Sequence, residues 1–242
     1  INLEEKKGSL FLSTQSFSAT ISGISSTEFP PVPDNIGKSD FSMPSEILAD
    51  LVNKIVFSAA VDESRPVLTG LLLIFGENLI AVATDGFRLS LKEMGNINIK
   101  RENKAKLLVP AKAINEVYKV FQGTGEIAVR IEDKEKRILF GGENGVLSSK
   151  LLEGEFPDYI KIMPVKWSSR AMVSKEEFTR AVKTASVFAR EAASVVKIGF
   201  EKDRLKISSE SKQYGSEEIF IDSKTEGGEI EVAYKQKARH LL

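Results

Sequence analysis

Apolar residues recur at helical spacing in three stretches of the chain, and each stretch predicts an amphipathic helix. The three apolar faces consist of Ile47, Leu48, Leu51, Val52, Ile55 and Val56, then Ile114, Val117, Tyr118 and Phe121, then Phe178, Ala181, Val182, Ala185 and Phe188. The first helix is expected to end near Phe57. Pro44 and Pro110 stand where the first helical residue is expected, a position at which a missing N–H costs nothing. Ser174 followed by Glu177 predicts a capping box at the third helix.

A meander of three short strands is predicted between the first two helices. Leu68–Phe75 and Leu79–Thr84 are apolar runs separated by turn residues, and Asp85-Gly86 forms a second tight turn before an apolar segment that contains Arg88. On spacing alone, an ordinary meander with a surface arginine is the favoured interpretation. The alternative is a small pocket with apolar walls and a basic rim, in which Thr84, Arg88 and Leu68 lie close together.

The order of these elements repeats along the chain, and the repeat says more about the fold than any single motif. A helix is followed by adjacent strands and then by a strand that runs into a second helix. The corresponding positions are Phe41 and Ala171, Val109 and Val232, and the Glu-Phe-Pro triplets at 28–30 and 155–157. Helices packed on antiparallel strands, repeated in this way, indicate an α+β architecture. The alternative is a chance resemblance between α+β segments.

The repeat divides the chain into three units. Residues 1–36 are expected to be the tail of one unit, 37–166 a complete unit, and 167–242 the front part of a third. Pro-containing stretches near residues 30–34 and 163–166 have the composition of linkers. Because the chain begins with Ile1, we expect it to be a piece of a longer one.

Composition limits the function further. Among 242 residues, 34 basic and 34 acidic side chains balance, so a tight, sequence-specific nucleic-acid binder is not the first expectation. The predicted helices nevertheless carry a net positive charge, which suits loose contact with a polyanion. There is no cysteine, which excludes disulfides and thiolate metal sites. No apolar run is long enough to span a membrane, and no signal-peptide pattern is present.

No set of residues suggests catalysis. His240 is the only histidine, and no motif surrounds it. Gly141–Gly145 lacks the Lys-Ser/Thr of a phosphate loop, so a hairpin turn is favoured. Asp85 is more simply a turn former than a catalytic acid. We expect a binding protein without metal or cofactor.

Three motifs in a fixed order resemble one family over essentially the whole chain. RPVLTG at 65–70, VATDGFRL at 82–89 and KLLEGEFPDY at 150–159 resemble the bacterial sliding clamp, the β subunit of DNA polymerase III. The resemblance implies repeated clamp domains, each with two helices packed on antiparallel β-sheet, that form an arc of a ring. The three units are then the end of domain 1, all of domain 2 and the first part of domain 3.

The resemblance also implies two functional surfaces. The partner-peptide site would consist of Leu68, Thr84, Gly86, Phe87, Arg88, Leu89, Pro157, Lys161 and Ile162. The DNA channel would be lined by Lys54, Arg65, Lys112 and Lys183. This sequence departs from the family in two places, since Phe87 stands where His is usual and Ile160-Lys161 where Arg-Arg is frequent. Both changes weaken polar contacts, and the C-terminal strand of the family's site is absent from this sequence.

The function implied is that of a processivity factor without enzymatic activity. As a homodimer in its full-length form, it would encircle duplex DNA and bind the polymerase III catalytic subunit, the clamp loader and other proteins with a clamp-binding motif. The location implied is the bacterial cytoplasm, at the nucleoid. We expect the present chain not to close a ring by itself. The alternatives are a carboxylate-dependent hydrolase on a repeated scaffold and a scaffold that binds only proteins.

Overall fold

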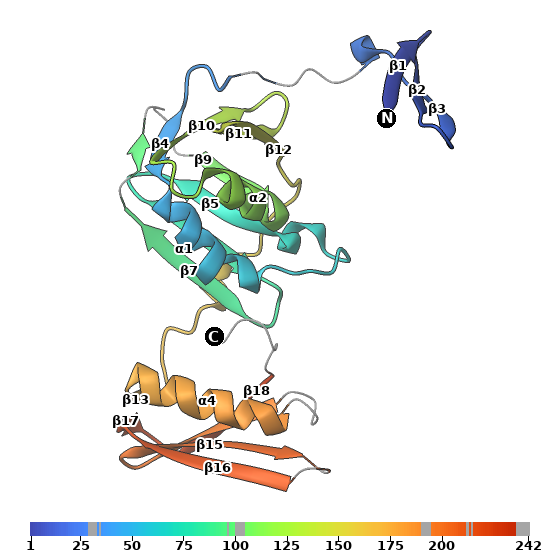
Figure 1. Cartoon of the computed structure of the whole chain (residues 1–242). Helices are drawn as coiled ribbons and strands as arrows, with labels where there is room; N and C mark the ends of the chain where they lie inside the picture. Colours follow the sequence, from blue (N-terminus) through green and yellow to red (C-terminus); the bar gives the residue numbers. More distant parts are fainter. Residues whose placement is uncertain are drawn as a thin grey trace. The chain divides into compact units, whose positions relative to one another are not determined.

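The computed structural model describes residues 1–28, 33, 35–95, 97–99, 105–189, 195–211, 213 and 215–235. The chain forms two compact units, Ile1–Phe156 and Pro157–Leu242 (Figure 1). The elements of the first unit are β1 (Asn2–Lys6), β2 (Ser9–Ser13), β3 (Ser18–Ser22), β4 (Phe41–Pro44), α1 (Glu46–Lys54), β5 (Gly70–Phe75), β6 (Leu79–Thr84), β7 (Leu89–Met94), β8 (Asn98–Ile99), β9 (Ala105–Pro110), α2 (Ala111–Phe121), β10 (Glu126–Glu132), β11 (Arg137–Gly142) and β12 (Gly145–Lys150). Short 3₁₀ helices cover Ser26–Glu28, Val56–Ser58 and Pro66–Thr69.

The first three strands form an antiparallel sheet in the order β1-β2-β3. Leu3 lies opposite Leu12, and Leu10 lies opposite Ile21. Because alternate residues of a strand share a face, these four apolar side chains lie on one side of the sheet.

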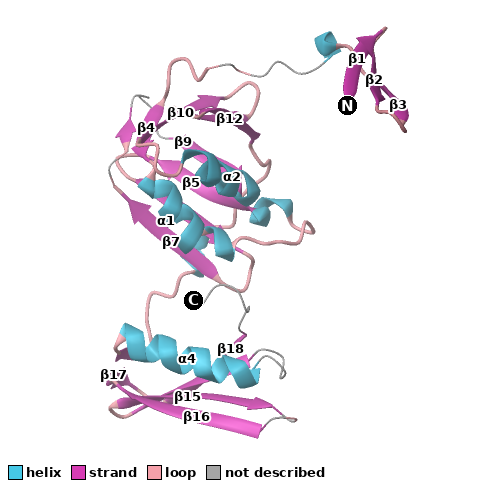
Figure 2. Ribbon diagram, viewed as in Figure 1, coloured by secondary structure: helices cyan, strands magenta, loops and turns pink. Residues whose placement is uncertain are grey.

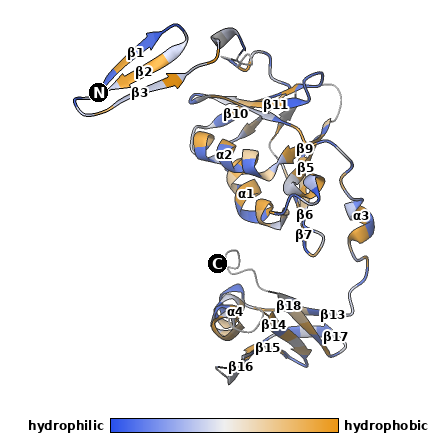
Figure 3. Cartoon of the chain, turned by 90° about the vertical axis from the view of Figure 1, so that its right-hand side faces the viewer, coloured by the Kyte–Doolittle hydropathy of each residue, from blue (hydrophilic) through white to orange (hydrophobic). Residues whose placement is uncertain are grey.

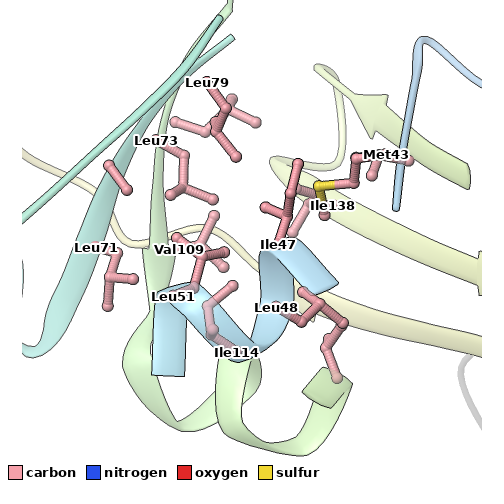
Figure 4. Packing of buried hydrophobic residues seen from close by; sticks show 14 of the residues in the cluster. Met43, Ile47, Leu48, Leu51, Leu71, Leu73, Leu79, Val109, Ile114 and Ile138 are labelled. Carbon is pink, nitrogen blue, oxygen red and sulfur yellow. The ribbon is translucent and has the colours of Figure 1, made fainter. Parts of the chain in front are cut away.

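Residues 41–156, which we call the central body, contain two antiparallel sheets and two helices (Figure 2). The sheet orders are β7-β6-β5-β9 and β12-β11-β10-β4-β8. Both sheets and both helices contribute to one hydrophobic core. Figure 4 shows Leu71, Leu73 and Leu79 of one sheet facing the same interior as Met43 and Ile138 of the other. Phe41 and Phe75 stack across this interior with ring centroids 4.5 Å apart.

The amphipathic patterns of the two central helices are confirmed by their burial. Ile47, Leu48 and Leu51 of α1 are buried, as are Ile114, Val117 and Phe121 of α2. The hydropathy colouring of Figure 3 shows apolar and polar residues interspersed along both helices. Packing of the apolar faces therefore holds the helices in the core, while their charged residues stay at the surface.

Several predicted boundaries were wrong by a few residues. Helix α1 ends at Lys54, and a separate 3₁₀ helix follows before the chain turns. Pro44 is the last residue of β4, and Pro110 is the N-cap of α2 with extended backbone. Each proline thus closes a strand, which suits its missing N–H at a sheet end.

The strand that was predicted from Leu68 begins at Gly70. Pro66 opens a 3₁₀ helix instead, and the Leu68 N–H donates to the Arg65 carbonyl oxygen at 3.0 Å. Leu68 in turn accepts a bond from the Ala60 N–H. A proline with its fixed φ favours this helical turn over an extended start.

Other strand predictions are confirmed. Ile127, Val129 and Ile131 are buried on one face of β10, and Leu205 and Ile207 are buried in the second unit. Strands β11 and β12 are joined by a tight turn at Gly142–Gly145, where Gly145 has a φ of +121°. The glycine-rich stretch is therefore the hairpin that was predicted.

The second unit contains the elements α3 (Tyr159–Ile162), β13 (Ser169–Met172), α4 (Lys175–Ala189), β14 (Val195–Glu201), β15 (Arg204–Ser211), β16 (Gly215–Asp222), β17 (Lys224–Gly227) and β18 (Ile230–Lys235). Helix α4 packs on the sheet through Ala181, Val182 and Ala185. At its start, the Glu177 N–H donates to the Ser174 Oγ at 3.4 Å, one of the two bonds of the predicted capping box. The helix predicted after β18, including His240, lies outside the described residues.

Strand pairing confirms the repeat that the sequence indicated. The sheet β7-β6-β5-β9 of the central body has its counterpart in β16-β15-β14-β18 of the second unit. The antiparallel pair β4–β8 corresponds in the same way to β13–β17. The order β1-β2-β3 likewise corresponds to β10-β11-β12. The same α+β arrangement therefore occurs more than once in this chain.

Candidate functional site

The turn between β6 and β7 is held by a single carboxylate. Asp85 Oδ1 accepts bonds from the Phe87 N–H at 3.0 Å and the Arg88 N–H at 3.1 Å. Its Oδ2 accepts a bond from Arg88 Nε at 3.1 Å. These contacts identify Asp85 as a turn former, as predicted, because an aspartate that bonds main-chain N–H groups two and three residues onward stabilises a tight turn.

Thr84 completes the turn from the strand side. Its hydroxyl donates to the Arg88 carbonyl oxygen at 2.7 Å and accepts from the Gly86 N–H at 3.0 Å. Gly86 has a φ of +92°, which residues with a Cβ rarely adopt. Thr84, Asp85 and Gly86 therefore hold the backbone of residues 84–88 in this turn.

The fixed turn presents an aromatic side chain to solvent. Phe87 is 96% exposed, whereas Thr84 is 5% and Leu68 is 3% exposed. The Arg88 guanidinium lies over the Phe57 ring, 5.6 Å from its centroid. Leu68 and Thr84 are thus buried, whereas Phe87 is open to solvent.

Leu89, the first residue of β7, is half-buried. The last three predicted peptide-site residues belong to the second unit. Pro157 is half-buried, and Lys161 and Ile162 are exposed on the short helix α3. Lys161 Nζ lies 2.9 Å from the Asp158 carboxylate. This contact raises the pKa of Lys161 and lowers the pKa of Asp158. The positive charge of Lys161 is accordingly paired with the carboxylate of Asp158.

One of the predicted DNA-channel residues lies in a small ion cluster. Asp50 of α1 lies 2.5 Å from Lys54 and also contacts Lys92 of β7. Hydrogen bonds from Lys54 and then Lys92 lower the pKa of Asp50. The hydrogen bond between Lys54 and Asp50 in turn raises the pKa of Lys54. Two lysines around one aspartate leave a net positive charge at this end of α1.

The other predicted DNA-channel residues differ in their surroundings. Lys112 at the start of α2 lies 3.5 Å from Glu63, and both side chains are exposed. Lys183 is exposed on α4. Arg65 differs from both, because its Nη2 donates to the Asp85 carbonyl oxygen at 3.1 Å. An exposed ion pair adds little stability, so Lys112 can exchange its partner for another anion at low cost.

The contact between Arg65 and the 84–88 turn was not predicted. Twenty positions separate Arg65 from Asp85. Arg65 precedes the 3₁₀ helix Pro66–Thr69 and Asp85 follows strand β6, and no sequence pattern links these two places. The Phe57 ring beneath Arg88 was missed for the same reason. Only the tertiary fold brings these residues together.

A cavity of about 330 Å³ lies elsewhere in the central body, between the start of α1 and the end of α2. Its lining residues are Ser45, Glu46, Ala49, Tyr118, Gln122 and Gly123. Within the described ranges, no three His, Cys, Asp or Glu side chains are grouped to hold a metal ion. None of the helices in the described part of the chain combines the length and apolar character needed to cross a membrane.

Comparison with protein families gives two adjacent matches. The family model described as DNA polymerase III beta subunit, central domain, matches residues 42–158. The model described as DNA polymerase III beta subunit, C-terminal domain, matches residues 160–238. The two models are those of successive domains of one protein, in the same order.

The chain is also similar to curated proteins that are named as sliding clamps. The Beta sliding clamp of Bacillus subtilis (strain 168) is 28% identical over 221 residues, and that of Staphylococcus aureus is 29% identical over 220 residues. Each alignment covers 90% of this chain and 58% of the relative. The chain therefore spans less than two thirds of the length of these curated relatives.

Solved structures show the same fold. The DNA polymerase sliding clamp from Bacillus subtilis aligns with a TM-score of 0.81 at 25% identity, over 96% of this chain and 62% of that one. The DNA polymerase III beta subunit from Thermotoga maritima aligns with a TM-score of 0.76 at 26% identity, over 96% and 63%.

Proposed function

The chain belongs to the DNA polymerase III beta-subunit family, and from this premise we propose that it is part of a sliding clamp. In this proposal the complete protein encircles duplex DNA as a homodimer and tethers the polymerase, without catalysing a reaction itself. The observation that carries the proposal is the succession of two beta-subunit domain matches along one chain. The repeated sheet topology supports it, because similar units joined in series suit a curved assembly.

We propose that the surface around Thr84–Leu89 binds a short linear peptide of partner proteins. These partners would include the polymerase catalytic subunit, the clamp loader and other proteins with the same motif. An exposed aromatic side chain on a preformed turn favours binding, because little conformational entropy is lost when the partner arrives. Leu89 and Arg88 add an apolar and a basic group beside it. Pro157, Lys161 and Ile162 stay predictions from the family resemblance.

DNA is proposed to contact the helices through diffuse electrostatics. Lys54, Lys112 and Lys183 lie on α1, α2 and α4, and Lys54 and Lys112 already have acidic partners. Weak phosphate contacts suit a protein that slides, since topological linkage rather than affinity retains the DNA. The proposed domains are residues 1–36, 37–166 and 167–242, and the proposed location is the bacterial cytoplasm, at the nucleoid.

A peptide titration tests the proposed partner site. A fluorescently labelled peptide with adjacent Leu and Phe residues is titrated with the protein extended to the length of its relatives, and the anisotropy of the peptide is measured. We expect saturable binding that Arg88→Ala and Phe87→Ala weaken. Glu143→Ala is the matched control, because Glu143 is exposed in a different hairpin turn. No binding by the unaltered chain, or equal weakening by the control, would contradict the proposed site.

A retention assay tests the proposed encirclement. The protein, extended to the length of its relatives, is loaded on circular DNA that is then cut once. Release on cutting is the expected result, because a ring slides off a free end. Retention after cutting would indicate ordinary DNA binding, and no loading at all would favour a scaffold that binds only proteins.

A further inference from the structure

The side chain of Arg65 lies directly against the proposed peptide-binding turn. Its Nη2 donates to the Asp85 carbonyl oxygen at 3.1 Å. A Cβ built on Gly86 would lie 3.1 Å from Nη1 and 3.2 Å from Nη2 of the same guanidinium. The planar guanidinium therefore lies beside Gly86, the one residue of the turn that has no side chain, and it donates to the carbonyl oxygen of the preceding residue.

The main chain of Arg65 begins a second element of the same surface. Its carbonyl oxygen accepts the Leu68 N–H at 3.0 Å and so opens the 3₁₀ helix Pro66–Thr69. One residue thus contacts both Leu68, which lies beneath the surface, and the turn that carries Phe87. Along the chain, strands β5 and β6 lie between the Pro66–Thr69 helix and this turn.

We propose that Arg65 is a positioning residue for the peptide-binding surface, which it serves by holding the Thr84–Leu89 turn against the Pro66–Thr69 helix. This inference rests on the proposed function of that surface. It gives Arg65 a role other than the DNA contact predicted for it. Asp85 supports the turn from within through its carboxylate, and Arg65 supports it from outside through the Asp85 carbonyl.

The chemistry of arginine suits this role better than that of lysine. A guanidinium is planar and has donors in a fixed fork, so it can lie flat on a glycine and still reach a carbonyl oxygen. A lysine ammonium at the same place can donate to the carbonyl oxygen, but it has no planar group that can lie against Gly86. Arg65→Lys should therefore retain only part of the effect.

Hydrogen exchange tests the positioning itself. In Arg65→Gln, we expect amide exchange at residues 84–89 to be at least several-fold faster than in the unaltered chain. Lys112→Gln is the matched control, because it removes the same charge from another predicted DNA contact without touching the turn. Unchanged exchange in Arg65→Gln would overturn the inference, whether or not a peptide binds.

Peptide affinity tests the consequence for function. We expect Arg65→Gln to weaken binding of the labelled Leu-Phe peptide by about fivefold to tenfold, as the loss of one ordinary, solvent-exposed hydrogen bond would. Lys112→Gln should leave the affinity unchanged, and Arg65→Lys should lie between. Equal affinity for Arg65→Gln and the unaltered protein, both extended to the length of the relatives, would refute the positioning role, whereas failure of the unaltered extended protein to bind would refute the proposed function.

Discussion

Replacing Asp85 by alanine removes three hydrogen bonds from the 84–88 turn at once. Two of them come from main-chain N–H groups, at 3.0 and 3.1 Å, and each is worth about 1 kcal/mol net. The third is the ion pair with Arg88, which is 29% exposed and so adds only about 0.5 kcal/mol. We therefore expect Asp85→Ala to lower the free energy of unfolding by about 2.5 kcal/mol.

Asp85→Asn separates these contributions. The amide keeps an oxygen that can accept both main-chain N–H groups, and it loses only the charge that faces Arg88. We expect a loss of about 0.5–1 kcal/mol for this variant. Glu143→Ala, which removes an exposed acid from another turn, should change the stability by less than about 0.5 kcal/mol.

Urea unfolding followed by far-ultraviolet circular dichroism measures the effect. With a denaturant slope of about 2 kcal/mol per molar urea, the expected loss shifts the unfolding midpoint by roughly 1 M for Asp85→Ala. Equal shifts for the alanine and asparagine variants would show that the two main-chain bonds contribute nothing. A shift no larger than that of Glu143→Ala would refute the account of the turn altogether.

Three further changes test other parts of the structure. Phe41→Ala removes one ring of the buried stack with Phe75 and should cost about 3–5 kcal/mol in urea unfolding, so a cost below about 1 kcal/mol would contradict the packing described. The pKa of Asp50 in the folded chain lies below its ordinary value near 3.8. Its two ion pairs therefore stabilise the fold fully above about pH 4, and this stabilisation is lost as the pH falls through the folded pKa. Asp50→Asn should therefore destabilise the chain at pH 7 and progressively less below about pH 4, and a pH-independent loss in thermal unfolding would argue against this linkage. Ser174→Ala should lower the stability by about 0.5–1 kcal/mol through loss of the bond to the Glu177 N–H, and faster exchange confined to the first turn of α4 should accompany it.

The regular elements of the fold could be predicted because their signals are local. Buried positions such as Leu48, Ile114 and Val129 follow the period of the helix or strand that carries them. The repeat of elements then indicated which strands correspond, and the pairing of β14 with β15 and β18 confirms it. Errors occurred at element ends, where Pro44 and Pro110 satisfy the preferences of a strand end and a helix start equally well.

The candidate site was predictable only in part. The Thr84-Asp85-Gly86 sequence predicted a tight turn, since its side chains bond main-chain groups two to four residues away. The sequence did not indicate that Leu68 would be covered, because burial depends on what packs against a residue. It also suggested a DNA phosphate contact for Arg65. The positive charge of Arg65 does not by itself indicate that its guanidinium donates to the Asp85 carbonyl oxygen.

By itself, then, the sequence determined the helices, the strands, the repeated order and the chemistry of the turn, because all of these depend on neighbours along the chain. The tertiary structure alone decided that Arg65 lies on Gly86, that Phe57 lies beneath Arg88, and that Phe87 is left in solvent. The contacts of Arg65 with Gly86 and of Phe57 with Arg88 join residues that lie many positions apart in the sequence. Only the packing of the sheets and helices brings them close together.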